Sequence, residues 1–285
     1  MRNQYHYFLA ALQFLTRIKV PDSFSYKPEY LERSSTYFPL VGSLVAAIGV
    51  MVYLVVNKYL GQDLAIFSFM LTTIWVTGAF HEDGLADTCD AFGGGWTKEK
   101  ILTIMKDSRL GTYGMIGLLG VLALKFLLLK ELMGVGAGVK VSDIFPPALS
   151  EFKHAAGKMS DTYPTYPYLL LLIAAHSASR FMAITIIQQY EYVTDIDQSK
   201  SKPLSRSPLT WRELLFSFAL AVWPLVFLSP WFWLVLVPMF VARTMLAQYF
   251  KRWIGGYTGD CLGATQQVTE IIFYLSALII WRFIL

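Results

Sequence analysis

The sequence predicts an all-α integral membrane protein that crosses the bilayer several times. Hydrophobic residues make up 55% of the 285 residues and charged residues only 15%, whereas a soluble domain carries about 25% charged residues. The mean hydropathy is +0.47. Several apolar runs also approach the roughly 20 residues that a helix needs to cross a bilayer. We therefore expect one membrane-embedded domain over residues 1–285, built as a polytopic helical bundle.

The apolar runs predict about 7–8 membrane segments. The first apolar stretch, residues 5–18, is short and contains Gln13 and Arg17, so it could span, re-enter or lie in the interface. It lacks the small-residue cleavage pattern of a signal peptide. The longer segments, in chain order, are residues 38–56, 64–80, 111–133, 167–190, 213–229, 231–250 and 264–283.

The polar loops between these segments predict which side faces the cytoplasm. Alternate threading places 13 Lys and Arg residues on one side and six on the other. The positive-inside rule assigns the more basic side to the cytoplasm. This bias also explains the net charge of +4 without a nucleic-acid partner. The long connection 134–166 is expected on the opposite side, and the cytoplasmic loops are residues 19–37, 81–110, 191–212 and 251–263.

Negative charge is concentrated in residues 81–96, HEDGLADTCDAFGGGW. Asp83, Asp87 and Asp90 are spaced i, i+4 and i+7, so a transmembrane helix that continued through them would carry all three on one face. Like charges so placed repel, and a cation between them removes the repulsion. Carboxylates without Cys or several His suit a hard ion such as Mg²⁺. We expect Glu82 and these three aspartates to hold magnesium; the alternative is a solvated helix end without a ligand.

The loop that follows, residues 93–114, has the composition of a phosphate-binding segment. Three glycines let the backbone approach a ligand closely, and basic side chains after them can neutralise phosphate. An Arg can grip phosphate with two hydrogen bonds. Beside an acidic metal site, this loop predicts a phosphate- or pyrophosphate-bearing substrate. The candidate binding residues are Lys106, Asp107 and Arg109.

A second glycine-rich motif, GGYTGDCLGATQQVTE, covers residues 255–270. Asp260 precedes the last helix, whose first turn presents free backbone N–H groups to an anion. We expect Asp260 to join the acidic residues in one site, with Gly255, Gly256 and Gly259 admitting a ligand. The alternative is a glycine-rich turn that Asp260 merely caps.

Charged residues also occur inside the apolar segments, where they are costly and usually face a cavity or a partner. Arg180, one turn after His176, is a further candidate for substrate binding. Lys125 could pair with Glu131 or extend to the interface, and is left out of the site. The two cysteines, Cys89 and Cys261, form no CxxC pattern, so neither a disulfide framework nor a zinc site is expected.

Six motifs together resemble the adenosylcobinamide-GDP ribazoletransferase, or cobalamin synthase, family. They are HEDGLADTCDAFGGG, IMKDSRLGTYG, GGYTGDCLGA, FLTRIKVP, YFPLVG and SRFMA, and they extend over nearly the whole chain. The departures are small: Cys89, and Ala91 where the family pattern has glycine. The resemblance implies a magnesium-dependent enzyme of the bacterial cytoplasmic (inner) membrane, with its active site facing the cytoplasm.

The resemblance also implies the reaction. The family joins adenosylcobinamide-GDP to α-ribazole or its 5′-phosphate, releasing GMP and forming adenosylcobalamin or its 5′-phosphate. The ribazole 3′-hydroxyl attacks the phosphorus attached to the aminopropanol arm, and a carboxylate not engaged by metal accepts the proton. The candidates for catalytic groups are Asp83, Asp87, Asp90 and Asp260, among which the sequence does not choose. CDP-alcohol phosphotransferases offer an analogy of mechanism only.

Two other classes of function compete with this reading. A transporter for corrinoids or phosphate compounds would also carry charges within the membrane, but it predicts inverted repeats that this sequence does not show. A non-catalytic scaffold for other cobalamin-assembly enzymes would not need a carboxylate face. Whether the chain forms a homo-oligomer or binds such enzymes is left open.

Overall fold

The computed structural model describes residues 2–136, 166–193 and 208–285. Within these ranges the chain is helical, apart from loops and one isolated bridge between Tyr192 and Tyr257. The all-α expectation is confirmed. The helices are α1 (Arg2–Leu15), α2 (Pro28–Ser34), α3 (Phe38–Leu60), α4 (Gln62–Thr77), α5 (Phe80–Gly94), α6 (Lys98–Met105), α7 (Thr112–Gly136), α9 (Tyr166–Gln189), α11 (Trp211–Val222), α12 (Leu236–Ile254) and α13 (Gly259–Phe283), with 3₁₀ turns η1 (Ser35–Tyr37), η4 (Trp223–Phe227) and η5 (Pro230–Val235).

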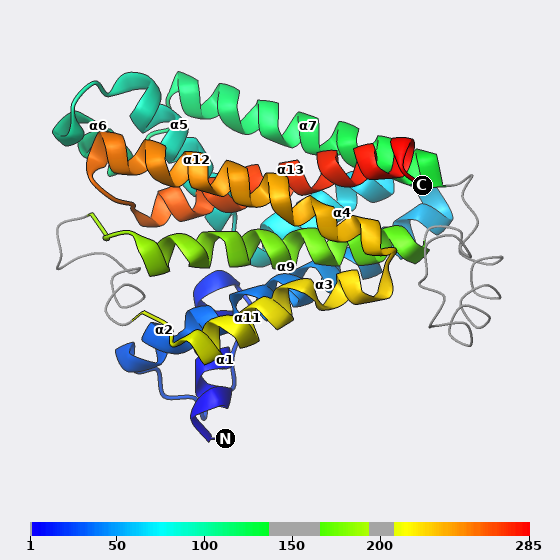
Figure 1. Ribbon diagram of the computed structural model, residues 1–285, viewed down its shortest axis with the longest axis horizontal. Helices are drawn as coiled ribbons and strands as arrows, with labels where there is room; N and C mark the ends of the chain where they lie inside the picture. Colours follow the sequence, from blue (N-terminus) through cyan, green and yellow to red (C-terminus); the bar gives the residue numbers. More distant parts are fainter. Residues whose placement is uncertain (1, 137–165, 194–207) are drawn as a thin grey trace.

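The long helices form a bundle along the longest axis of the molecule (Figure 1). Helix α13 packs against α5, α7, α9 and α12, so it is the central element. Its inner face is fully buried, with Phe273 and Tyr274 in the main core. The outer surface carries large apolar side chains, such as Trp75 at 78% and Ile116 at 64% exposure. A surface of this kind fits a lipid bilayer.

Five helical segments of the described chain are long and apolar enough to span a membrane, and a bent pair, α4 with α5, makes up to six. The expected count of about 7–8 is therefore not confirmed. Residues 213–229 do not form one long helix, because the 12-residue α11 gives way to η4 at Trp223, next to Pro224. The predicted loops 134–166 and 191–212 fall largely outside the described residues.

Helix α1 is too short to cross the bilayer. Its 14 residues extend roughly 21 Å, against a hydrocarbon core of about 30 Å. It lies across the direction of the long helices and packs against α2 and the start of α3 (Figure 1). Of the three options for residues 5–18, the structure thus excludes a full span.

The apolar segment 64–80 does not continue as one helix into the acidic residues. Gly78 (φ 67°) and Ala79 (φ 59°) are both left-handed, and their N–H groups bond back to the last turn of α4, which is a common helix end. The chain then turns by 87° into α5. A continuous helix through the aspartates, which the sequence left as a condition, does not form, because this turn interrupts it. The three aspartates still lie on one helix face with i, i+4, i+7 spacing, since residues 83–90 all lie within α5.

Glycines set the distance between α5 and its neighbours. A Cβ atom on Gly84 would lie 3.0 Å from the Cα and carbonyl oxygen of Asp260, and 3.3 Å from the Cα of Gly263. On the other side of α5, a Cβ on Gly117 of α7 would lie 2.5 Å from Cys89 Sγ. Small residues permit such close crossing of membrane helices. As a result, the first turn of α13 lies directly against the acidic part of α5.

Candidate functional site

Four aspartates from two helices meet at one end of the bundle. Asp83 is exposed, and Asp87 and Asp90 are partly buried on α5. Asp260, in the first turn of α13, is also partly buried. The charges of Asp83, Asp90 and Asp260 all act on Asp87, so the four carboxylates are close neighbours. We call these four residues the acidic face. The structure therefore brings the two glycine-rich motifs together.

No Lys or Arg of the described ranges forms an ion pair with a member of the acidic face. The face is therefore an uncompensated group of hard oxygen donors, which suits Mg²⁺ chemically. However, no three His, Cys, Asp or Glu side chains in the described parts are already arranged to hold a metal ion. Magnesium usually takes only one or two protein carboxylates and completes its shell with water and substrate phosphate. The carboxylates of the acidic face therefore fit Mg²⁺, because one or two of them would be enough.

Asp90 has a structural partner that the sequence did not reveal. Its carboxylate oxygens accept hydrogen bonds from the backbone N–H groups of Gly111 (2.6 Å) and Gly114 (2.8 Å). These N–H groups belong to the start of α7, so Asp90 caps that helix from a neighbouring one. A Cβ on either glycine would collide with the Asp90 carboxylate. Gly111 and Gly114 thus serve packing here.

Glu82 does not lie on the acidic face. It is 7% exposed, and its Oε1 accepts a hydrogen bond from Gln267 Nε2 at 2.9 Å. The charges that act on it are those of Lys125, Glu270 and Arg180. The structure thus places Glu82 in a second, buried group of polar residues. We call this group the buried polar network; its members are Glu82, Lys125, His176, Arg180, Gln266, Gln267 and Glu270.

Glu270 of α13 is the centre of the buried polar network. Its carboxylate lies 2.8 Å from Lys125 Nζ and accepts a hydrogen bond from Gln266 Nε2 at 2.6 Å. His176 Nε2 is 3.3 Å away but is not aligned for a hydrogen bond. Arg180 donates to the His176 carbonyl at 2.7 Å. These contacts tie α7, α9 and α13 together inside the bundle.

From the sequence, Lys125 had no firm partner, and Glu131 was one candidate. That pairing is wrong, because Glu131 binds Arg282 at 2.8 Å near the opposite end of the bundle. Lys125 instead pairs with Glu270. The sequence did show one cation, Lys125, and one anion, Glu270, each inside an apolar segment. Nothing in the sequence spacing showed that the two segments face each other.

The basic loop lies at the same end as the acidic face but is turned outward. The Arg109 side chain is 85% exposed and binds Asp107, with Nε 2.9 Å from Oδ1. The hydrogen bonds from the Arg109 side chain and backbone hold the pKa of Asp107 down to about 2. Lys106 is also exposed. Arg109 and Asp107 thus pair with each other and not with the aspartates of the acidic face.

The second glycine-rich loop packs against the first. The Lys98 Nζ lies 3.5 Å from the position that a Cβ of Gly255 would occupy, and the Thr258 hydroxyl lies 3.0 Å from Met105 Sδ. Gly255 (φ 87°) ends α12 in the left-handed conformation that favours glycine. A Cβ on Gly256 would collide with the Glu191 carbonyl. The fold therefore requires glycine at both positions. Contact of Gly255 and Gly256 with a substrate stays a prediction.

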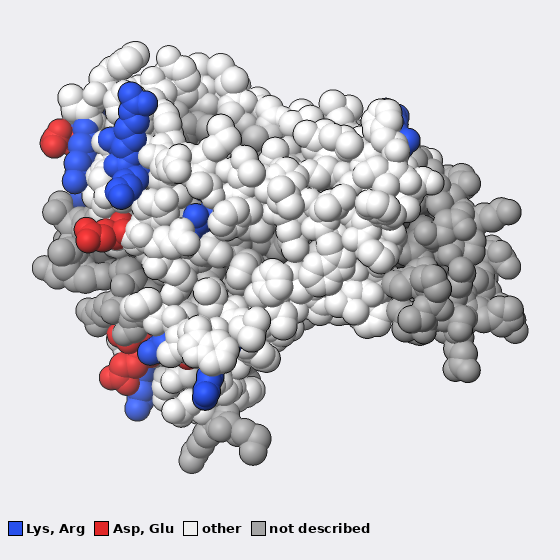
Figure 2. Space-filling view, viewed as in Figure 1, with Lys and Arg blue, Asp and Glu red and all other residues white. Residues whose placement is uncertain are grey.

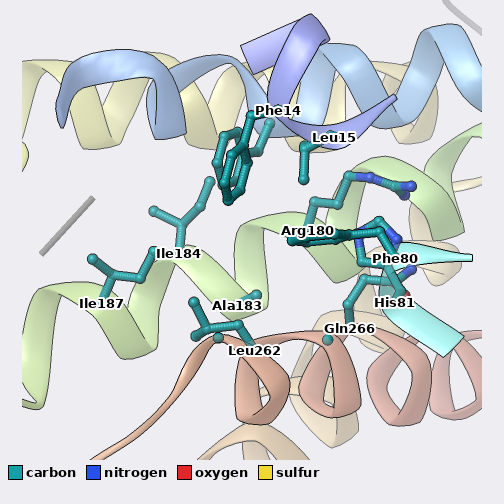
Figure 3. Close-up of a pocket in the computed structure, with 13 residues that line it drawn as sticks. Phe14, Leu15, Phe80, His81, Arg180, Ala183, Ile184, Ile187, Leu262 and Gln266 are labelled. Carbon is teal, nitrogen blue, oxygen red and sulfur yellow. The ribbon is translucent and has the colours of Figure 1, made fainter. Parts of the chain in front are cut away.

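A small, largely apolar cavity of about 30 Å³ lies beside the first turns of α13 (Figure 3). Helices α1, α3, α5, α9 and α13 all contribute to its wall. Gly259 and Gly263, on either side of Asp260 in the chain, line it as well. Its polar lining residues are His81, Arg180 and Gln266. Two candidate binding residues, Gly259 and Arg180, therefore meet in one cavity.

Comparisons with known proteins agree with these motifs. A family profile described as cobalamin-5-phosphate synthase, CobS, matches residues 7–278. Proteins named adenosylcobinamide-GDP ribazoletransferase are similar over nearly their full length. That of Shewanella amazonensis is 42% identical, covering 96% of this chain and 95% of the relative. That of Vibrio cholerae is 38% identical, covering 98% and 95%.

A relative of the same name from Leptospira interrogans is 36% identical, covering 99% of this chain and 98% of its own. No solved structure matches the chain. A family match over almost the whole length, with relatives above 35% identity, is decisive for family membership. This chain belongs to the CobS, or cobalamin-5-phosphate synthase, family.

Proposed function

We propose that this chain joins adenosylcobinamide-GDP to α-ribazole, or to its 5′-phosphate, and releases GMP. The observation that carries the proposal is the acidic face, formed where α5 and α13 cross at Gly84 and Gly263. It gathers four carboxylates from the two motifs that most resemble the family. The names of the relatives, all of them transferases, support the same reaction.

We propose that Asp83 and Asp87, one turn apart on α5, hold magnesium. Both are free of ion pairs in the described parts of the chain, whereas Asp90 is engaged with the start of α7. The bound ion would supply charge stabilisation on the pyrophosphate of adenosylcobinamide-GDP. The requirement for Mg²⁺ and the identity of its ligands are parts of this proposal.

Asp260 is suited to act as the base. It faces the same carboxylates from α13, and the charge of Asp83 acts on it. In the reaction the ribazole 3′-oxygen bonds to the phosphorus next to the aminopropanol arm, and the bond from that phosphorus to GMP breaks. The hydroxyl proton passes to the carboxylate, while GMP leaves with the bonding electrons. Lys98, at the junction of the two loops, can offset phosphate charge.

We propose that the protein lies in the bacterial cytoplasmic membrane with the acidic face toward the cytoplasm. Charged side chains gather at the end of the bundle where α6 lies, while the middle of the visible face is apolar (Figure 2). The positive-inside rule assigns the more basic end to the cytoplasm. Both substrates would then enter from the aqueous cytoplasmic side.

One assay tests the proposed function. Purified protein in liposomes is supplied with adenosylcobinamide-GDP, α-ribazole and Mg²⁺, and GMP and the corrinoid product are measured. We expect stoichiometric GMP and complete corrinoid, and loss of both when Mg²⁺ is chelated. Corrinoid uptake into the liposomes without any GMP release would instead support a transporter. No observation on the described residues favours that alternative.

A further inference from the structure

We propose that a groove beside the last turns of α4 binds a membrane phospholipid by its headgroup phosphate. This inference goes beyond the proposed reaction and rests only on the placement of the protein in a bilayer. Three observations support it: an open groove of about 360 Å³, a cation in its wall without an anion, and an apolar stripe that leads away from it. We call this space the lipid groove. Its walls include Arg17, Leu71, Thr72, Trp75, Gly78 and Ala79.

The fold holds Arg17 against the end of α4. Its backbone N–H donates a hydrogen bond to the carbonyl of Val76 at 2.8 Å, so the loop after α1 is fixed to the last turn of α4. A Cβ atom on Gly78 would lie 2.6 Å from Arg17 Nε and 3.3 Å from its Cδ. The side chain therefore crosses the turn directly over this glycine. Arg17 is nevertheless exposed, so its guanidinium is accessible from the lipid groove.

The guanidinium of Arg17 has no anionic partner within the described ranges. No ion pair or hydrogen bond joins its side chain to another described residue. By contrast, Arg33, Arg109 and Arg282 each bind a carboxylate. A guanidinium can bind a phosphate group with two parallel hydrogen bonds. Arg17 is therefore suited to an anion that comes from outside the chain.

The lipid groove lies close to one surface of the bilayer. Helix α4 begins at Gln62, and Asp63 in its first turn forms an exposed pair with Lys130. Its 16 residues extend roughly 24 Å, most of the hydrocarbon thickness of about 30 Å. Trp75, near the other end, is 78% exposed, and tryptophan is enriched where hydrocarbon meets headgroups. The lipid groove thus lies at headgroup depth, in the leaflet on the side where α5 begins.

An apolar stripe leads from the lipid groove along the outer face of α4. Four large apolar side chains, spaced three or four residues apart, are at least 50% exposed there: Leu64, Phe67, Leu71 and Trp75. Leu64 and Trp75 are eleven residues apart, roughly 16 Å along the helix axis. One leaflet of the hydrocarbon core is about 15 Å thick. A phosphate at Arg17 with an acyl chain along the stripe matches this geometry, whereas a free phosphate would leave the stripe without a partner.

The lipid groove also adjoins the turn from which α5 starts. Gly78 and Ala79 line it, and Phe80 is the first residue of α5. A bound phospholipid would therefore pack against the turn that gives α5 its direction. A ligand that binds the folded state and not the unfolded state raises the apparent stability. Occupancy of the lipid groove should thus raise the unfolding temperature of the protein.

The first test compares three ligands on the unaltered protein. Delipidated protein in neutral detergent receives phosphatidylglycerol, diacylglycerol, which lacks the phosphate, or glycerol phosphate, which lacks the chains. Binding is measured by native mass spectrometry and by thermal unfolding. We expect one tightly retained phosphatidylglycerol with a higher unfolding temperature, and binding at least about tenfold weaker for either fragment. Equal binding of glycerol phosphate would assign the lipid groove to a soluble phosphate compound, and equal binding of diacylglycerol would exclude a role for Arg17; either result overturns the proposal.

The second test compares two substitutions in the same loop. Arg17→Gln removes the cation of the lipid groove, whereas Lys19→Gln removes an exposed cation that does not line it. We expect the affinity for phosphatidylglycerol to fall at least about tenfold in Arg17→Gln and to stay within about twofold in Lys19→Gln. Equal losses in the two variants would overturn the proposal, because general attraction to a basic loop would then explain the binding. If Arg17→Gln does not fold, the comparison of ligands on the unaltered protein still decides. Neither test contains a substrate, so failure here is distinct from a failure to release GMP.

Discussion

The residues of the acidic face differ in the hydrogen bonds and ion pairs that they already make. Asp90 accepts two backbone hydrogen bonds from the start of α7, whereas Asp83 is exposed and has no ion-pair partner in the described ranges. A side chain with satisfied structural bonds stabilises the fold. A charged side chain without them, among other like charges, is available to a ligand. Asp83 and Asp90 therefore predict different results on substitution, although they share one helix face.

Asp83→Asn should abolish turnover while leaving membrane insertion intact. The substitution removes one negative charge from the acidic face and leaves the size of the side chain unchanged. We expect GMP release to fall at least about 100-fold, a loss typical of groups that act on transition-state charge. The measurement is GMP release at limiting Mg²⁺. Normal activity of this variant under that condition would refute the metal assignment.

A matched control is available at the other end of the bundle. Asp63 is exposed there and pairs with Lys130 at 2.7 Å. Asp63→Asn removes the same charge by the same chemical change, and exposed pairs of this kind contribute only about 0–1 kcal/mol. We therefore expect its GMP release to match that of the unaltered protein.

The Lys125–Glu270 pair predicts a loss of stability when only one partner is removed. Glu270→Gln leaves the Lys125 ammonium buried, at 4% side-chain exposure, without its anion. Breaking a buried pair typically costs about 3–5 kcal/mol, whereas apolar replacement of both partners is often tolerated. Thermal unfolding in detergent should thus show a large decrease for Glu270→Gln and partial recovery with Lys125→Met added. No recovery in the double variant would show that His176 and Gln266, not Lys125, depend on Glu270.

At the scale of helices, the crossing of α5 over α13 determines whether the acidic face exists. The two helices approach closely because Gly84 and Gly263 have no side chains at the contact. Asp83 is adjacent to Gly84, and Asp260 is one turn from Gly263. Any change that separates the helices therefore also separates the two halves of the acidic face.

Gly84→Ala should reduce both stability and turnover. The new Cβ would lie 3.0 Å from the backbone of Asp260, which cannot move aside as a flexible side chain could. Overpacking of this kind typically costs about 1–3 kcal/mol. The control is Gly120→Ala on α7, where a Cβ would meet nothing within 4 Å. That substitution should be neutral or stabilising by up to about 1 kcal/mol. Equal effects of the two variants in thermal unfolding and GMP release would contradict the role of the crossing.

The helical elements could be predicted from the sequence to different degrees. The apolar runs correctly indicated α3, α7, α9, α12 and α13, because length and hydropathy are local properties. The register of the aspartates was also local and was found. The turn at Gly78 and Ala79 was missed, since a non-glycine residue in the left-handed region gives no pattern signal. The Lys125–Glu270 pair was missed because it depends on which helices become neighbours.

At the scale of the whole molecule, the arrangement of charge separates one end of the bundle from its middle. Charged side chains gather near α6 and α2, and the central belt of the visible face carries almost none (Figure 2). The acidic face and both glycine-rich loops belong to that charged end. A bilayer around the apolar belt would leave this end in water, where charged substrates can reach it. The orientation of the molecule in the membrane therefore determines from which side substrates reach the acidic face.

Thiol labelling from each side of the membrane tests that orientation. The native cysteines are poor probes, because Cys261 is fully buried and Cys89 is only partly exposed against α7. In a background with both replaced by alanine, Ser108→Cys would place an exposed thiol at the charged end. Gly134→Cys would place one near the far end of α7, where a side chain meets nothing within 4 Å.

With a membrane-impermeant reagent, we expect Gly134→Cys to be labelled in intact spheroplasts and Ser108→Cys only in inverted vesicles. The expectation follows from the excess of Lys and Arg in the loops at the Ser108 end, 13 against six. The GMP assay on the same inverted vesicles provides the functional control, since substrates added outside would then reach the acidic face directly. Labelling of Ser108→Cys in intact spheroplasts would place the acidic face outside the cytoplasm. Because GMP and adenosylcobinamide-GDP are charged and do not cross a bilayer unaided, that result would also separate the site from its substrates.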